Sequence, residues 1–167
     1  MLTFVDANVL VYARDLRDPQ KRQRAAQWLE SLWAERRGRT SCQVLSEFYA
    51  VATRKLHVPA DQAWDEAARY FAWSPQVIDA ALLRRAREIE RRYQTSWWDS
   101  MIVAAAQVQD CVILLTEDLQ EGMTFGTLAV RSPFSSVVEQ PPADYAVARA
   151  HPLHRPRGRP RRAAAAA

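Results

Sequence analysis

The chain has 167 residues, 49% of them hydrophobic and 25% charged, which is enough for one globular domain with its own core. Its longest uninterrupted apolar run, residues 101–106, is far too short to cross a bilayer, so the composition excludes a membrane-spanning protein. Asp6 falls where a secretory signal would need apolar residues, and Cys42 and Cys111 match no zinc or disulfide spacing. We therefore expect a cytoplasmic protein without zinc.

The net charge of +4 belongs to the C-terminal segment. Residues 149–162 contain six arginines, and no acidic residue occurs from position 149 onward, so the rest of the chain is slightly acidic. Residues 139–167 are also rich in proline, which interrupts both helices and sheets, and we predict that they are disordered. Two interpretations stay open: a basic arm that adds phosphate affinity, or a solvated extension without a role.

Short apolar segments alternate with helical patterns between residues 2 and 131. The expected strands are residues 2–6, 39–42, 111–115 and 127–131. The expected helices follow Asp18-Pro19, cover residues 43–52 and 61–72, and start at Ser74-Pro75 and at Ser96. This alternation indicates an α/β fold with a parallel sheet covered on both faces. The chain has four glycines and no Gly-rich phosphate loop, which disfavours nucleotide binding.

Four acidic residues lie at predicted ends of strands or starts of helices. Asp6 closes the first strand, Asp118 follows the strand at 111–115, Glu47 lies about one turn into a helix, and Asp99 lies in the first turn of another. Because the carboxyl ends of parallel strands meet at one edge, these acids can converge there.

Converging carboxylates need a counter-charge. Two of them 5 Å apart repel by roughly 3 kcal/mol at an effective dielectric constant near 20. No lysine or arginine lies within three residues of Asp6, Asp99 or Asp118. A bound divalent metal is the natural counter-charge, and an all-oxygen ligand set favours Mg²⁺ or Mn²⁺.

Each acid also has a simpler interpretation when it is taken alone. Asp99 could complete a capping box with Ser96, Glu47 could stabilise a helix N-terminus, and Asp118 could be a turn residue. Asp6 is harder to explain in this way, because it interrupts an apolar strand and a buried acid needs a partner.

Four segments of the chain resemble the PIN-domain family, in particular the VapC-like toxin ribonucleases of bacterial toxin–antitoxin pairs. These segments are DANVLVY at residues 6–12, QVLSEFY at 43–49, WDSMI at 98–102 and LTEDL at 115–119. The sequence VRSPF at 130–134 also resembles the last strand and Pro-Phe pair of that family. The resemblance covers residues 1–138 and implies a three-layer α/β/α sandwich with a central parallel sheet.

The resemblance also implies a site. The acids that would hold Mg²⁺ or Mn²⁺ are Asp6, Glu47, Asp99 and Asp118. The residues that would support them are Asn8, Ser41, Ser46, Ser96 and Glu117. Asp6, Asp99 and Asp118 would bind the metal directly, while Glu47 would bind it through water or help to deprotonate the nucleophile. A metal-activated water would then hydrolyse an RNA phosphodiester and leave a 5′-phosphate and a 3′-hydroxyl.

Expected partners are an RNA substrate and, by the resemblance, a cognate antitoxin and a second copy of the chain. The basic residues that flank the acids are candidates for phosphate contacts. They are Arg14, Arg17, Lys21, Arg22 and Arg24 after the first strand, and Arg36, Arg37 and Arg39 before the helix of Glu47. Trp64, Tyr70 and Trp73 either belong to the core or form an apolar surface for a partner protein.

Three other functions stay open at this point. A catalytically silent module could keep the fold and bind RNA or the antitoxin without cleaving. A phospho-receiver-like signalling domain also has acids at strand ends, but it needs a lysine near its last strands, and the only lysines here are Lys21 and Lys55. A structure-specific DNA nuclease uses the same metal chemistry, but this chain has no room for a DNA-clamping helical arch.

Overall fold

The computed structural model describes residues 1–135, and the predictions for the tail at 139–167 lie outside these residues. The strands are β1 (Thr3–Val5), β2 (Gly38–Arg39), β3 (Ile113–Leu115), β4 (Thr124–Phe125) and β5 (Leu128–Arg131). The helices are α1 (Ala7–Tyr12), α2 (Pro19–Ala34), α3 (Cys42–Arg54), α4 (Ala60–Arg69), the 3-10 helix η1 (Tyr70–Trp73), α5 (Ala80–Tyr93) and α6 (Trp97–Val108). Within the described part of the chain, no helix is both long and apolar enough to span a bilayer.

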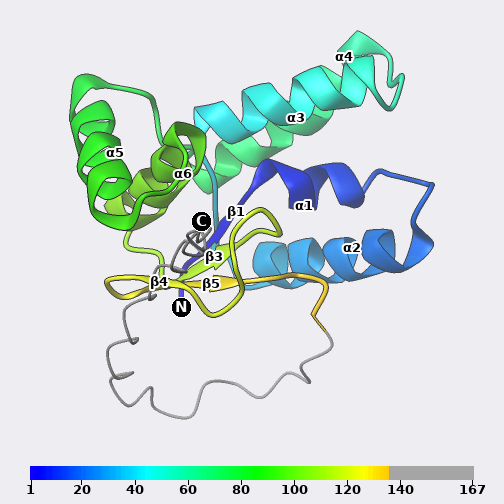
Figure 1. Ribbon diagram of the computed structural model, residues 1–167. Helices are drawn as coiled ribbons and strands as arrows, with labels where there is room; N and C mark the ends of the chain where they lie inside the picture. The colour runs from blue at the N-terminus through cyan, green and yellow to red at the C-terminus, as the bar shows by residue number, and fades with distance from the viewer. Residues whose placement is uncertain (136–167) are drawn as a thin grey trace, which may run out of the picture. The chain divides into compact units, whose positions relative to one another are not determined.

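The five strands form one sheet in the order β2-β1-β3-β5-β4, with helices around it (Figure 1). Strands β2, β1, β3 and β5 are parallel, as predicted, and the α/β class is confirmed. Strand β4 was not predicted. It runs antiparallel to β5 through a tight turn at Gly126, whose φ of 67° suits glycine. Two residues are too few to show the alternation that marks a strand.

Helix α6 lies in the core. Its residues from Ser100 to Ala106 are all buried, which explains why the longest apolar run of the sequence belongs to a helix without a polar face. It packs along α5, while α3 packs against both α1 and α4. The largest fully buried side chains include Phe4, Phe48 and Phe125.

The N-terminal caps expected at Asp18 and Ser96 are present. Asp18 accepts a hydrogen bond from the Lys21 amide, and Ser96 accepts one from the Asp99 amide. The helix start predicted at Ser74-Pro75 is wrong, since α5 begins at Ala80.

Long-range pairing explains this error. The amide of Gln76 donates to the carbonyl of Thr40, and the carbonyl of Gln76 accepts from the amide of Cys42. These bonds keep the segment extended beside the start of α3. Ser74, with a φ of 50°, instead ends η1, and Asp79 caps α5 by accepting from the Leu82 amide.

Candidate active site

Asp6 lies at the junction of β1 and α1. The register of the sheet pairs Val5 with Leu115, so the next residues in each chain segment, Asp6 and Thr116, are neighbours. The Asp6 side chain is 7% exposed and caps α1 by accepting from the Ala7 amide at 2.7 Å. Its other oxygen, Oδ2, accepts from the Thr116 hydroxyl at 2.7 Å. The apolar residues after Asp6 therefore form a helix, and the prediction that Asp6 interrupts a strand is wrong.

Asn8 joins Asp6 to Asp118. Its amide nitrogen lies 3.3 Å from Asp6 Oδ2, 3.0 Å from Asp118 Oδ2 and 3.0 Å from the Thr116 hydroxyl oxygen. The Asn8 carbonyl oxygen is buried and has no hydrogen-bond partner within residues 1–135. One side chain thus orients two carboxylates from strands that are adjacent in the sheet.

Thr116 is a site residue that the sequence analysis did not select. It is 1% exposed, donates to Asp6, and accepts from Asn8 and from the Asp118 amide at 3.1 Å. The available signal was a hydroxyl residue placed directly after a buried strand and two positions before an acid. Threonine is common in strands, so this signal is weak without the pairing partner.

The other two predicted acids, Glu47 and Asp99, are carried by helices α3 and α6. Glu47 is exposed in the second turn of α3, and Asp99 lies half-buried in the first turn of α6. The Ser96 hydroxyl donates to Asp99 Oδ2 at 2.7 Å and accepts from the Asp99 amide at 3.1 Å. Ser96 is therefore the N-cap of α6, and its hydroxyl holds the Asp99 carboxylate in place; among the described residues, the reciprocal bond of a capping box, from the Ser96 amide to that carboxylate, is not present.

Burial and neighbouring charges raise the pKa of Asp6 and of Glu47. The pKa of Asp6 is raised to about 6, mainly by burial and less by the nearby charges of Asp118 and Glu47. Hydrogen bonds from Thr116 and from the Ala7 amide act in the opposite direction and lower it. The pKa of Glu47 is also raised, first by loss of solvent and then by Asp118, with a smaller contribution from Asp99.

Lys55 lowers the pKa of Glu47 but does not reverse this rise. All four predicted acids therefore lie within electrostatic reach of at least one other. They gather at one site with little positive charge from the protein.

The donor set fits Mg²⁺ or Mn²⁺. It consists of carboxylate oxygens, the ligands that these hard cations prefer. Among residues 1–135, no three acidic, histidine or cysteine side chains stand close enough to share one ion directly. Mg²⁺ usually binds through one or two carboxylates and keeps several waters, so this spacing suits it.

The other expected supporting residues serve local structure. Ser41 caps α3 by accepting from the Val44 amide at 3.2 Å, and the Ser46 hydroxyl donates to the Cys42 carbonyl at 2.8 Å. In the described part of the chain, neither serine bonds to a carboxylate.

Glu117 points to a different set of residues. Both of its oxygens lie 2.8 Å from the Lys21 ammonium, and Oε1 also accepts from the Tyr12 hydroxyl at 3.1 Å. The ammonium lies 4.3 Å from the centre of the Tyr12 ring and 4.9 Å from that of Phe134. Lys21, which we expected to contact phosphate, is thus engaged, and its cluster holds the loop that carries Asp118 against α1 and α2.

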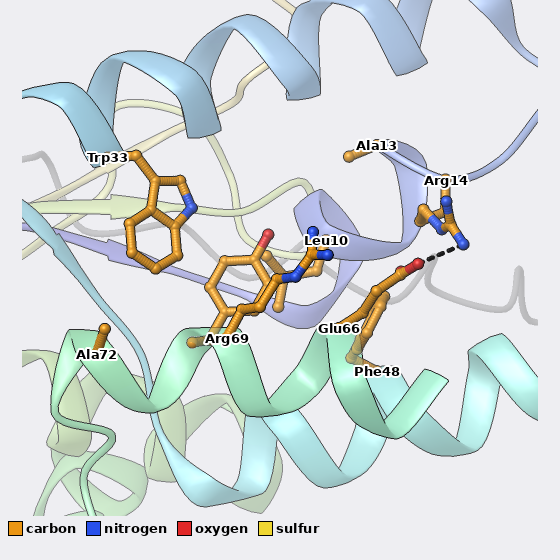
Figure 2. A pocket seen from close by; sticks show the side chains of 9 residues that line it. Leu10, Ala13, Arg14, Trp33, Phe48, Glu66, Arg69 and Ala72 are labelled. Carbon is orange, nitrogen blue, oxygen red and sulfur yellow. Dashed lines mark ion pairs between the residues drawn. The ribbon is translucent and has the colours of Figure 1, made fainter. Parts of the chain in front are cut away.

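A hollow of about 610 Å³ lies away from the acids, between α1, α2, α3 and α4 (Figure 2). Its lining residues are Leu10, Ala13, Arg14, Trp33, Phe48, Glu66, Arg69, Tyr70 and Ala72. Figure 2 shows the Arg14–Glu66 ion pair at one end and Trp33 at the other. Of the three aromatics singled out by the sequence, Trp73 is core, Tyr70 lines this hollow, and Trp64 is 56% exposed.

Comparisons with known proteins agree with the fold. The family model of the PIN domain matches residues 3–120. No curated protein matches the chain. Among solved structures, it resembles the Sarcin-Ricin loop cleaving toxin VapC20 of Mycobacterium tuberculosis at 20% identity and a TM-score of 0.50, covering 67% of this chain and 86% of that one.

The chain also resembles VapBC2 from Rickettsia felis, solved bound to a DNA fragment from its promoter. The identity is 18% and the TM-score 0.53, over 79% of this chain and 98% of the other. At such identities the likeness concerns the fold, whereas the family model covers most of the described residues. The chain belongs to the PIN-domain family.

Proposed function

We propose that this protein is a divalent-metal-dependent endoribonuclease and the toxin of a toxin–antitoxin pair. The observation that carries the proposal is the buried Asp6 carboxylate, which shares the Asn8 amide with Asp118 and, within residues 1–135, forms no ion pair with a lysine or arginine. Membership in the PIN-domain family and the fold shared with a toxin that cleaves the Sarcin-Ricin loop support it.

The proposed roles follow from the contacts. Asp6, Asp118 and Asp99 are the proposed ligands of Mg²⁺ or Mn²⁺, directly or through water. When bound, such an ion supplies a water that ionises near neutral pH and a positive charge against the phosphoryl oxygens. Thr116 keeps Asp6 oriented and favours its ionised form, because it donates to the carboxylate.

Glu47 is the proposed proton acceptor. Its raised pKa brings it closer to the pH of reaction, and its exposed position lets it reach a water at the edge of the site. Attack by water does not need the ribose 2′-hydroxyl, so we expect a 5′-phosphate and a 3′-hydroxyl as products.

The test is cleavage of a 5′-labelled RNA by the purified protein with Mg²⁺, with Mn²⁺, and with EDTA. We expect cleavage with either metal and none with EDTA. Asp6→Asn should abolish it, and Asp65→Asn on the exposed face of α4 is the matched control that should cleave normally. RNA binding without cleavage under all conditions would favour the catalytically silent alternative.

For the partner, we propose a cytoplasmic complex with an antitoxin that covers the hollow of Figure 2, and a homodimer of the toxin. Support comes from the exposed aromatic pair Trp64 and Phe71, on α4 and η1, which also contribute lining residues to that hollow, and from the fold shared with VapBC2. Expression should arrest growth, and Asp99→Asn should relieve the arrest. A small reading frame next to the gene should encode a protein that binds wild type but not a Trp64→Glu variant. Light scattering of the purified chain tests the dimer.

A further inference from the structure

A second hollow, of about 420 Å³, lies at the end of α1 opposite to Asp6. It is bounded by the loop between α1 and α2 and by the C-terminal end of α3. Its lining residues are Arg14, Asp15, Leu16, Arg17, Arg22, Lys55, Leu56, His57 and Val58. Four of these side chains are cationic and one is a carboxylate, so the hollow is strongly positive, although the described body as a whole is not.

The walls of this hollow are fixed by internal bonds. Asp15 is 6% exposed, and its Oδ1 accepts from the Arg17 amide at 2.9 Å and from Arg17 Nε at 2.8 Å. Its Oδ2 accepts from Arg17 Nη2 at 2.7 Å. The Arg17 side chain is nevertheless 73% exposed, so one face of the guanidinium is held and the other faces solvent. Across the hollow's edge, Arg14 pairs with Glu66 of α4.

The other two cations are uncompensated. Within residues 1–135, neither Arg22 nor Lys55 takes part in an ion pair. Arg22 lies in the first turn of α2, and Lys55 caps the C-terminal end of α3. A positive hollow with a preorganised arginine and two free cations matches the needs of a phosphate group, which accepts bonds from both guanidinium and ammonium.

The basic hollow lies at the C-terminal ends of α1 and α3, and Asp6 and Glu47 lie toward the N-terminal ends of the same two helices. Helices α1 and α3 pack side by side, and both the loop after α1 and the turn after α3 lie at the right of Figure 1. Arg14 follows Asp6 by eight residues, and Lys55 follows Glu47 by eight, which is about 12 Å along a helix.

We propose that this basic hollow is a phosphate subsite, which binds the backbone of the RNA strand a few nucleotides away from the bond that is cleaved. The inference rests on the proposed function and adds a binding site to it. Phosphate contacts position a strand without reading its sequence, so the subsite fixes the register of the RNA on α1 and α3 and supplies affinity.

The experiment compares two double variants with equal loss of charge. Arg22→Ala/Lys55→Ala removes the free cations of the hollow, and Arg84→Ala/Arg91→Ala removes two exposed arginines of α5. Binding of a fluorescent 12-nucleotide RNA is measured by anisotropy in EDTA, between 0.05 and 0.5 M salt. Thermal unfolding confirms that both variants are folded.

We expect the hollow variant to bind about 25-fold more weakly near 0.1 M salt, with a salt slope lower by about 1.4, while the α5 variant binds like wild type. In cleavage assays, the rise in KM for the hollow variant should be larger than any change in kcat. Equal affinity of the hollow variant and wild type, or equal losses in both variants, would overturn the subsite. If wild type binds RNA but never cleaves it, the proposed nuclease fails, while the anisotropy comparison still decides on the subsite.

Discussion

The two ends of α1 each hold a buried carboxylate, and the two behave in opposite ways. Asp6 is 7% exposed and Asp15 is 6% exposed. Burial, opposed by only two hydrogen bonds, raises the pKa of Asp6 to about 6. Hydrogen bonds from the Arg17 side chain and backbone lower the pKa of Asp15 to about 2. Burial alone therefore does not decide the state of an acid; the groups that face it do.

The comparison separates a structural acid from a reactive one. Asp15 is neutralised and locks a loop, whereas Asp6 is left with acidic neighbours and a donor set that suits a hard cation. Removing a group that a protein keeps at an energetic cost should damage function, while removing one that is fully paired should damage stability.

The largest expected difference between Asp6 and Asp15 is in the rate of RNA cleavage after substitution. Asp6→Asn should lower the rate of RNA cleavage at least about 100-fold, because changes even in groups that support metal ligands cost 10- to 100-fold. Asp15→Asn should keep a near-normal rate at saturating RNA but unfold at a lower temperature, because it loses the charge that pairs with Arg17. The measurement is initial rate beside a melting curve for each variant. Full activity in Asp6→Asn would remove Asp6 from the mechanism.

Stability against pH tests the same acid without catalysis. The folded pKa of Asp6 is raised from 3.8, so the folded protein holds a proton that the unfolded chain has lost between about pH 4 and 6. Asp6 therefore costs stability above pH 6, by up to about 3 kcal/mol, and the cost fades toward pH 4. In EDTA, urea titrations should show Asp6→Asn more stable than wild type at pH 8 and equal to it at pH 4.

Added Mg²⁺ extends this test. It should raise the melting temperature of wild type at pH 8 by binding the folded state, and it should leave Asp6→Asn unchanged. A wild-type protein that is more stable than Asp6→Asn at pH 8 in EDTA would contradict the raised pKa.

Thr116→Val addresses the support of Asp6. It removes the 2.7 Å bond that favours the ionised carboxylate but keeps the size of the side chain. We expect the Mg²⁺ concentration for half-maximal cleavage to rise by about 10- to 100-fold, and the acid limb of the pH–rate profile to move to higher pH. Thr53→Val on α3, whose hydroxyl bonds only to backbone carbonyls, is the control. An unmoved pH profile would make Thr116 merely structural.

The smallest effect should come from the paired neighbour of Asp118. Glu117→Gln weakens a partly exposed ion pair with Lys21, which is worth about 1 kcal/mol or less. Cleavage should fall only a few-fold, because a glutamine side chain can still accept from the Tyr12 hydroxyl and the Lys21 ammonium. Asp118→Asn, one residue further, should lose activity like Asp6→Asn. Similar losses of activity in Glu117→Gln and Asp118→Asn would contradict the distinction between paired and unpaired acids.

Local signals in the sequence predicted most of the elements. The helix starts at Asp18-Pro19 and Ser96 were correct because a capping side chain bonds within three residues of itself. The start at Ser74-Pro75 failed because Gln76 bonds to residues more than thirty positions earlier. Strand β4 and helix α1 were not predicted, because they are too short for a periodic pattern of apolar residues to appear.

The candidate site divides in the same way. The four acids were chosen from the sequence because each lies at the end of a predicted strand or near the start of a predicted helix, and the structure brings them within electrostatic reach. Thr116 was missed and Lys21 was assigned to phosphate, because their partners, Asp6 and Glu117, lie about a hundred residues away.

The amino-acid sequence by itself determined the α/β alternation, the parallel sheet and the positions of the acids at element ends, since these depend on periodicity and on neighbours a few residues apart. Only the tertiary structure decided which distant polar groups face the carboxylates of the site. The register of β1 beside β3 places Thr116 on Asp6 and brings Asn8 to Asp118, across more than a hundred residues of sequence. The charge state of a buried acid depends on atoms within a few ångströms, and strand pairing and packing select those atoms.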